Sequence, residues 1–191
     1  MRPLRVGRIA ALNMYPIYHG LERAADHTLE FTDGVPTTLN AAVLEGRLDV
    51  SAMSSIAYAR NADRLTLVPV ASITADGAVD SIQLFSRVPF EEVRSVAVTP
   101  HSATTVALLR ILLGPDVPFT TLDRPPARAL EDVDGVLLIG DEALAGLHAP
   151  FAPHRTDLAE AWSARTGHPM VFAVWAATPL AAAVGASVGA A

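Results

Sequence analysis

Short hydrophobic runs alternate with stretches of helical periodicity along most of the chain. Alternating or continuous apolar runs predict strands, and apolar positions three and four residues apart predict helices. In the first half, the strands expected are residues 4–9, 29–32, 48–53, 65–73 and 81–86. The helices expected between them are residues 15–24, a segment opening at Pro36 and stopping before Gly46, and one that follows Ser54 and Ser55 and ends near Asn61.

A second series of elements begins after Pro89. The strands expected there are residues 95–99, 120–122, 135–139 and 170–176, and the helices are residues 102–113, 126–131, 142–147 and 157–166, with a loop over 148–153. Strands that alternate with helices are typical of βαβ units, so we predict an α/β fold with mostly parallel sheets and helices on both faces. Residues after Thr178 lack a polar face, so they are expected to form a frayed tail or one more helix.

Composition limits the function classes that remain. The chain has 191 residues, long enough for one large domain or two small ones. Its net charge of −6 disfavours nucleic acid as a partner, since phosphate binding needs a basic surface. It contains no Cys, which excludes disulfides, thiolate nucleophiles and cysteine metal sites. All fourteen basic residues are Arg, so no lysine Schiff base or pyridoxal-phosphate anchor is possible.

The sequence also carries expectations about location. The first ten residues lack the basic start and unbroken apolar core of a signal peptide. No apolar stretch reaches the length of about 20 residues that crosses a bilayer, because the Ala-rich tail is short and broken by Gly. We therefore expect a cytoplasmic protein with no membrane partner. The sequence makes no prediction about oligomeric state.

Small polar residues occur at four places where a predicted strand ends. These are Asn13, the pair Ser54 and Ser55, residues 101–105, and Gly140 with Asp141. Ligands of open α/β sheets bind beyond the carboxyl ends of the strands. Helix N-termini offer unpaired N–H groups there, and hydroxyls add donors, so the four junctions together favour a site for an anion such as a carboxylate. The alternative is that each residue only caps a helix, a position these residue types prefer.

Three of these candidates have distinct signals. Ser102, Thr104 and Thr105 supply three hydroxyls in four residues, more than one helix cap needs. Asn13 follows the first strand, and its alternative is a turn residue. Ser81 begins the extended segment where the first series passes to the second, and its alternative is an ordinary strand serine.

Acid–base and metal chemistry have weaker support. His101 lies beside a candidate junction, but a solvent-exposed loop histidine is the simpler interpretation. Asp141 could act as a base or accept a backbone N–H, and the structural role is favoured slightly. The other histidines lack metal-ligand spacing, and the chain has neither a Gly-rich phosphate loop nor a G-x-S-x-G nucleophile elbow. We expect no metal and no cofactor.

Six segments occur in an order and at a spacing typical of one known family. They are RVGRIAALNMYPIYHGL, GVPTTLNAAVLEGRLDVSAMSSIAYARNAD, SIQLFSRVP, VAVTPHSATTVALLRILL, GVLLIGDEAL and DLAEAWSARTGHPMVFAVWAA. These segments, over roughly residues 4–177, resemble the chorismate dehydratases of the futalosine route to menaquinone. A sister family, 1,4-dihydroxy-6-naphthoate synthase, shares the fold and fits the segments less well.

The resemblance implies a two-lobed fold of the type II periplasmic-binding-protein kind, closing over a ligand. Its crossover strands would fall near residues 81–86 and 172–176. Lobe 1 is expected over residues 1–85, with 177–191 returning to it or frayed, and lobe 2 over residues 86–176.

The resemblance also implies an activity. It is the conversion of chorismate to 3-[(1-carboxyvinyl)oxy]benzoate with loss of water, in which the substrate's enolpyruvyl carboxylate takes the proton. Asn13 matches the Asn of the family's N-x-x-P motif, and Ser81 matches the Ser that opens its hinge strand, so both are expected to be catalytic. Ser102, Thr104 and Thr105 match its carboxylate binders, and the other junction residues complete the expected site.

Other functions stay open. A non-catalytic binding module for a small carboxylate metabolite would use the same site. Members of the family continue beyond the length of this chain, with helices that return to the first lobe, so a truncated and inactive product is a third hypothesis. His101 stands where the family has a small residue, which would alter the rim of the site.

Overall fold

The chain folds into two compact units. The computed structural model describes residues 2–23, 28–100, 102–148, 151–179 and 181. Unit 1 comprises residues 1–73 and 172–191, and unit 2 comprises residues 74–171. Among the described residues, no helix combines the length and the apolar character needed to cross a membrane.

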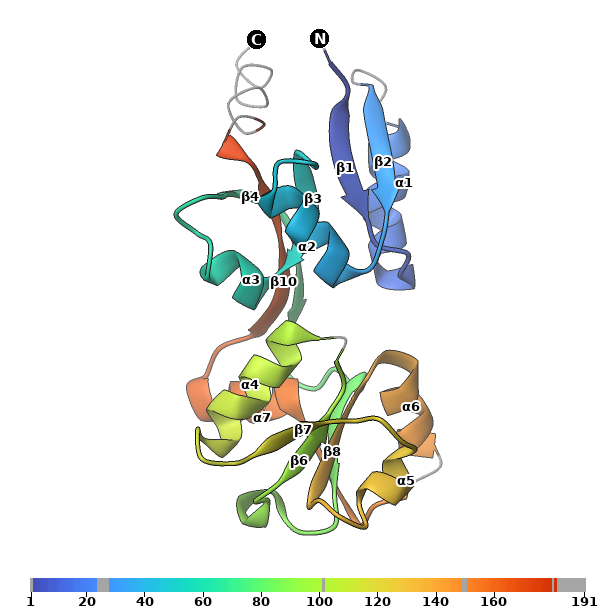
Figure 1. Ribbon diagram of the computed structural model, residues 1–191, viewed down its shortest axis with the longest axis vertical. Helices are drawn as coiled ribbons and strands as arrows, with labels where there is room; N and C mark the ends of the chain where they lie inside the picture. Colours follow the sequence, from blue (N-terminus) through green and yellow to red (C-terminus); the bar gives the residue numbers. More distant parts are fainter. Residues whose placement is uncertain (1, 24–27, 101, 149–150, 180, 182–191) are drawn as a thin grey trace. The chain divides into compact units, whose positions relative to one another are not determined.

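Unit 1 is built on a five-stranded sheet in the order β2-β1-β3-β10-β4 (Figure 1). Its strands are β1 (Leu4–Arg8), β2 (Leu29–Asp33), β3 (Val50–Ser54), β4 (Thr66–Ala75) and β10 (Met170–Ala177). β1 is parallel to both β2 and β3, and β10 is antiparallel to β3. The three parallel strands therefore end at one edge of the sheet.

Helices cover both faces of this sheet. They are a 3-10 turn η1 (Leu12–Met14), α1 (Tyr15–Arg23), α2 (Pro36–Leu44) and α3 (Ser55–Ala59), with α1 and α2 on opposite faces in Figure 1. Met53 of β3 packs in a cluster with Leu39 and Val43 of α2, whereas its neighbour Ala52 packs with Tyr18 of α1. Successive strand residues point to opposite faces, so β3 is apolar on both sides and its sequence shows no alternation.

Unit 2 repeats this plan with a second sheet in the order β7-β6-β8-β5-β9. Its strands are β5 (Ile82–Ser86), β6 (Val96–Val98), β7 (Phe119–Thr121), β8 (Gly135–Ile139) and β9 (His154–Asp157). Its helices are η2 (Phe90–Glu92), α4 (Ala103–Leu113), α5 (Pro126–Ala129), α6 (Gly140–His148) and α7 (Leu158–Thr166). β6 is parallel to β7 and β8, and β5 is antiparallel to β8 and β9. Figure 1 shows α4 and α7 on one face and α5 and α6 on the other.

The predicted α/β class is confirmed, and three details differ. β9 was not expected, because its sequence HRTD is mostly polar and exposed, and it forms by pairing with β5 at the sheet edge. β5 is antiparallel to β8 and β9, and β10 is antiparallel to β3, whereas β1 is parallel to β2 and β3, and β6 to β7 and β8. The expected lobe boundary at 85/86 falls after β5, which belongs to the sheet of unit 2. Of the tail expected after Thr178, residue 180 and residues 182–191 lie outside the described residues.

At one helix position in unit 2, Gly146, a larger residue would crowd a buried side chain. A Cβ at Gly146 of α6 would lie 2.6 Å from the Phe85 ring, which is buried and packs against Phe151. Gly146→Ala is therefore expected to lower the free energy of unfolding by about 1–3 kcal/mol, measured by urea denaturation. Gly20→Ala on α1 is the control, because the added methyl group meets open space there. Its free energy of unfolding should rise by about 0.5–1 kcal/mol. Equal effects of the two substitutions would contradict the packing argument.

Candidate functional site

The candidate residues of unit 1 lie at the carboxyl edge of its sheet. β1 and β3 run parallel with Gly7 opposite Ser51, so their carboxyl ends lie side by side. Asn13 follows β1 in the turn η1 and is exposed. Ser54 ends β3 and Ser55 begins α3. The structure thus brings the three predicted residues of this unit to one edge.

Ser54 is a helix cap and also has a second contact. Its Oγ accepts a hydrogen bond from the backbone N–H of Ala57, 3.4 Å away, and another from Asn40 Nδ2, also at 3.4 Å. Both bonds use the oxygen as acceptor, so neither consumes the hydroxyl proton. The cap alternative is therefore correct for Ser54 without excluding a ligand.

Asn40 of α2 was missed by the sequence reasoning. Its Oδ1 is buried and has no hydrogen-bond partner among the described residues. A buried acceptor without a partner is costly, and such atoms are rare in native structures. The available signal was an Asn inside the otherwise apolar run of α2, a position where Asn is unfavourable. Asn40 therefore joins Ser54 as a polar group at this edge.

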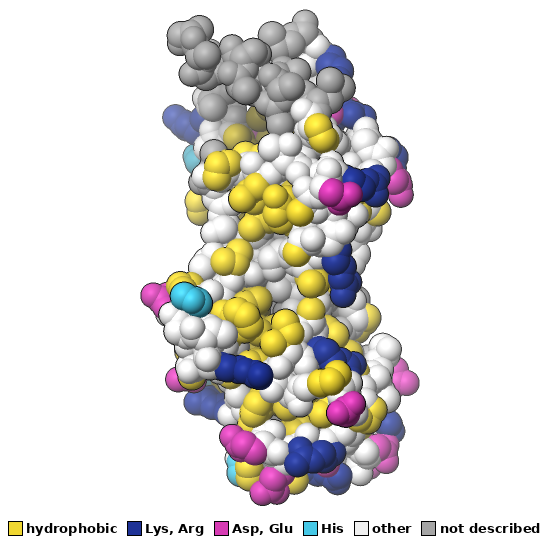
Figure 2. Space-filling model, turned by 90° about the vertical axis from the view of Figure 1, so that its left-hand side faces the viewer, with side chains coloured by type: hydrophobic (Ala, Val, Ile, Leu, Met, Phe, Trp, Pro, Cys, Tyr) yellow, Lys and Arg dark blue, Asp and Glu magenta, His cyan; other side chains and the backbone are white. Residues whose placement is uncertain are grey.

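Apolar side chains are exposed beside Asn13. Leu12 is 90% exposed and Tyr15 is 61% exposed, on either side of Asn13 in the sequence. Val35, 62% exposed, follows β2, whose end lies beside the end of β1. Leu12, Tyr15 and Val35 offer an apolar contact next to polar donors, the usual composition of a small-molecule site. Hydrophobic side chains also reach the surface on the face drawn in Figure 2.

The candidate residues of unit 2 also share a carboxyl edge. β6 and β8 run parallel with Val98 opposite Leu137, and α4 and α6 begin where these strands end. Gly140 donates its N–H to the carbonyl oxygen of Ser81 at 2.7 Å. Ser81, Gly140, Asp141 and the start of α4 therefore lie at the same edge of the second sheet.

The start of α4 contains a pair of linked hydroxyls. Ser102 Oγ and Thr105 Oγ1 lie 2.6 Å apart, and Ser102 Oγ also accepts the Thr105 N–H at 3.3 Å. Thr104 and Thr105 are buried. One hydroxyl proton is used between the two oxygens, which leaves the other proton of the pair outside this bond. Ser102 is thus the N-cap of α4, and the pair can still donate to an anion at the positive end of the helix dipole.

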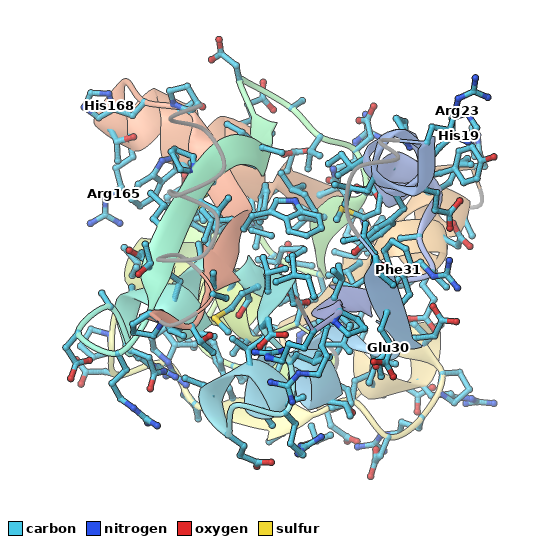
Figure 3. The ribbon with its side chains drawn as sticks, turned by 90° about the horizontal axis from the view of Figure 1, so that it is seen from above. His19, Arg23, Glu30, Phe31, Arg165 and His168 are labelled. Carbon is cyan, nitrogen blue, oxygen red and sulfur yellow. The ribbon has the colours of Figure 1, made fainter. Side chains whose placement is uncertain are left out.

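The remaining polar candidates divide into described and undescribed residues. Gly140 has a φ of +60°, a conformation that side chains disfavour, and Asp141 is exposed in the first turn of α6. His101 lies outside the described residues. Figure 3 shows His19 and His168 pointing outward, and within the described ranges no group of three or more His, Asp or Glu side chains could hold a metal ion.

A hollow of about 460 Å³ lies in unit 2, next to the segment that carries Ser81. Its lining includes Asp80, Gln83 and Asp157. The predicted site residues do not line it. Asp80 directly precedes Ser81, so the hollow lies on a side of this segment that sequence reasoning did not consider.

Comparison with known proteins decides the family. The model of the family described as "Menaquinone biosynthesis" matches residues 4–188. The chain belongs to the menaquinone biosynthesis family.

Two relatives within this family are named chorismate dehydratase. The protein from Thermus thermophilus is 35% identical over 193 aligned residues, which cover 92% of this chain and 70% of the relative. The protein from Campylobacter jejuni is 30% identical over 173 residues, covering 87% of this chain and 64% of the relative. The family predicted from the sequence is confirmed, and the relatives support an enzyme of the chorismate dehydratase type.

Solved structures with a similar fold show which architecture the chain has. Protein AF1704 from Archaeoglobus fulgidus matches with a TM-score of 0.69 at 20% identity, covering 93% of this chain and 68% of that one. The periplasmic aliphatic sulphonate binding protein SsuA from Escherichia coli matches with a TM-score of 0.66 at 17% identity, covering 98% and 69%. These likenesses concern the fold, and they confirm the predicted periplasmic-binding-protein-like architecture.

Proposed function

We propose that this protein dehydrates chorismate to 3-[(1-carboxyvinyl)oxy]benzoate, in menaquinone biosynthesis. One observation carries the proposal: in a chain 35% identical to a chorismate dehydratase, each sheet presents hydroxyl-bearing helix starts at its carboxyl edge. Chorismate carries two carboxylates, and hydroxyls with backbone N–H groups at helix starts suit such anions. A cytoplasmic location is part of the proposal and rests on the biosynthetic role of the family.

The reaction makes small demands on the protein. Chorismate loses a ring proton and a ring hydroxyl as water, and the ring becomes an aromatic benzoate, which supplies the driving force. The substrate's enolpyruvyl carboxylate takes the proton, so the protein needs no strong base. Its main task is to hold the substrate in the reactive orientation.

We assign roles at the two edges on this basis. Asn13 and Ser81 contact the reacting part of the substrate through their amide and hydroxyl groups. The start of α4 binds a carboxylate through Ser102, Thr104 and Thr105. Ser54 and Ser55 contribute hydroxyl groups. Gly140 has its N–H bonded to the Ser81 carbonyl oxygen, so its part is a close approach of the backbone to the substrate, without a side chain in between. Asp141 contacts a substrate hydroxyl, because its own negative charge repels a carboxylate.

A turnover assay tests the proposal. Purified protein is incubated with chorismate, and product is followed by the ultraviolet absorbance of a benzoate and by mass spectrometry. We expect chorismate to be consumed with release of one water. Binding of chorismate without its consumption, detected by a thermal shift, would instead support the binding-module alternative.

Substitution of Ser102 by Asp separates capping from anion binding. Asp is as good an N-cap as Ser and suits the helix dipole, so the stability of α4 should not fall. If Ser102 also binds a carboxylate, the new charge repels the substrate, and KM for chorismate should rise by about tenfold or more. Ala145→Asp, on the exposed side of α6, adds the same charge away from this edge and should leave KM unchanged. An unchanged KM in Ser102→Asp would show that Ser102 only caps α4 and does not bind the substrate.

A further inference from the structure

We propose that Asp157 is a positioning residue for Ser81, and that it acts by fixing the backbone around that serine. The inference rests on the proposed function, because it gives Asp157 a part in the same reaction. Asp157 ends β9, the strand that pairs with β5, and it is 7% exposed. The sequence reasoning treated it only as the start of a helix.

One carboxylate oxygen of Asp157 caps the N-terminus of helix α7. Oδ1 accepts the backbone N–H of Ala159 at 2.9 Å and that of Glu160 at 3.1 Å. Asp157 is thus the N-cap of α7. This is a structural task, and Ser or Asn can perform it as well as Asp.

The other oxygen has a different task. Oδ2 accepts the backbone N–H of Val79 at 3.0 Å, that of Asp80 at 2.7 Å and the side-chain Nε2 of Gln83 at 2.6 Å. These donors precede and follow Ser81 in the chain. Gln83 is 2% exposed, so this bond is shielded from water. A single carboxylate oxygen therefore accepts hydrogen bonds from residues on both sides of the proposed catalytic serine.

The backbone that Asp157 holds is strained. Asp80 has a φ of +59°, the one positive value among the described non-glycine residues. Ser81 donates its N–H to Val79 O at 2.6 Å, which closes a tight turn around Asp80. Such turns are rare, and left-handed conformations of non-glycine residues cost about 1–3 kcal/mol. The surrounding contacts must hold this turn, and Asp157 supplies two of its hydrogen bonds.

Ser81 is fixed from its other side by strand β8. Its carbonyl oxygen accepts the N–H of Gly140, which follows β8 at the candidate edge. Asp157 on one side and Gly140 on the other thus set the position of the Ser81 backbone. A displacement of about 1 Å at a reacting group can cost a hundredfold in rate.

Asp157→Asn separates the two tasks. The amide keeps one oxygen for the cap of α7 and turns an NH₂ group toward three N–H donors. Helix α7 should remain, whereas the segment around Ser81 should lose its acceptor. We expect kcat for chorismate to fall by about 10- to 100-fold, with KM within about threefold of the wild-type value.

A double-mutant cycle with Ser81→Ala shows whether the effect passes through Ser81. Kinetics and urea unfolding are measured for the wild type, Asp157→Asn, Ser81→Ala and the double variant. If Asp157 acts by positioning Ser81, its substitution should lower kcat by less than about threefold once Ser81 is already Ala. A purely structural role predicts the same fold-loss in both backgrounds, and that result would overturn the inference.

Asp134→Asn is the matched control. Asp134 accepts hydrogen bonds from Arg87, Arg94 and Ser95, and it precedes β8 at the end opposite Gly140. This variant should lose stability and keep the wild-type kcat. A fall in kcat equal to that of Asp157→Asn would overturn the inference, because any lost carboxylate in unit 2 would then suffice.

The remaining outcomes are also decisive. If Asp157→Asn does not fold, the same cycle is measured with Gln83→Met, because this substitution leaves the cap of α7 intact. If neither variant folds, Asp157 serves folding alone, and the inference is overturned. Wild-type kcat in a folded Asp157→Asn would overturn it as well. Absence of turnover in the wild type is a distinguishable result, since it rejects the proposed function before any variant is compared.

Discussion

Ser81→Ala is expected to lower kcat for chorismate by about 10²- to 10³-fold, the usual cost of removing one donor from a reaction site. Ser81 is only partly buried, and its backbone is held by bonds that the substitution keeps, so the free energy of unfolding should change by less than about 1 kcal/mol. Steady-state kinetics and urea unfolding of the same preparation measure both quantities. Losses of activity that parallel losses of stability would point to a structural serine.

Asn13→Ala should behave in the same way. Asn13 is exposed in η1, so its removal should change the free energy of unfolding by no more than about 0.5 kcal/mol while kcat falls. Asn61→Ala is its matched control in unit 1. The Asn61 amide donates to the Ala57 carbonyl at 2.9 Å, so this variant should be slightly less stable with unchanged kcat. Full activity in Asn13→Ala would remove Asn13 from the site.

The second large effect is on stability. Asp49→Ala should lower the free energy of unfolding by about 2–3 kcal/mol, because Asp49 is 1% exposed and accepts hydrogen bonds from the guanidinium groups of Arg2 and Arg5 and from the Arg5 N–H. Removal of one partner from a fully buried pair costs about 3–5 kcal/mol. The value here is smaller because the Arg2 side chain is 53% exposed. Asp33→Ala, which removes an exposed partner of Arg8, should lower the free energy of unfolding far less than Asp49→Ala, because exposed ion pairs are screened by solvent.

Asp49 also predicts an acid-sensitive stability. The hydrogen bond from Arg2, with those from Arg5, lowers the pKa of Asp49 well below its usual range, although burial acts in the opposite direction. A lowered pKa in the folded state means that this stabilisation is complete above the unfolded pKa of about 3.9 and is lost as the pH falls below it. Urea unfolding of the wild type between pH 7 and pH 3 should show this loss, and Asp49→Asn should show less of it. The same pH dependence in both proteins would contradict the assignment.

The sequence predicted the parts of the fold that hydrophobic pattern controls. The strand at residues 135–139 was located to the residue, because β8 is buried on both faces and bounded by glycines. The sequence pattern did not predict β9, because it is a polar edge strand whose formation depends on pairing with β5 rather than on its own side chains. The antiparallel direction of β5 and β10 follows from pairing with strands far away in the sequence, which periodicity does not encode.

The candidate site divides in a similar way. The positions of Ser54 and Ser102 at the starts of helices could be predicted, because small polar residues at strand ends are visible in the sequence, and their binding roles stay predictions. It missed Asn40 and Asp157, whose importance lies in contacts with distant residues. The bond from Gln83 to Asp157 joins positions 74 residues apart, and no local pattern predicts it.

The most direct test of the account is a crystal structure of the Ser81→Ala variant with chorismate bound. We expect a substrate carboxylate within hydrogen-bonding distance of Ser102 or Thr105 at the start of α4, and the Asn13 amide in contact with the same molecule. Chorismate that contacts only one of these two places, or neither of them, would contradict the account.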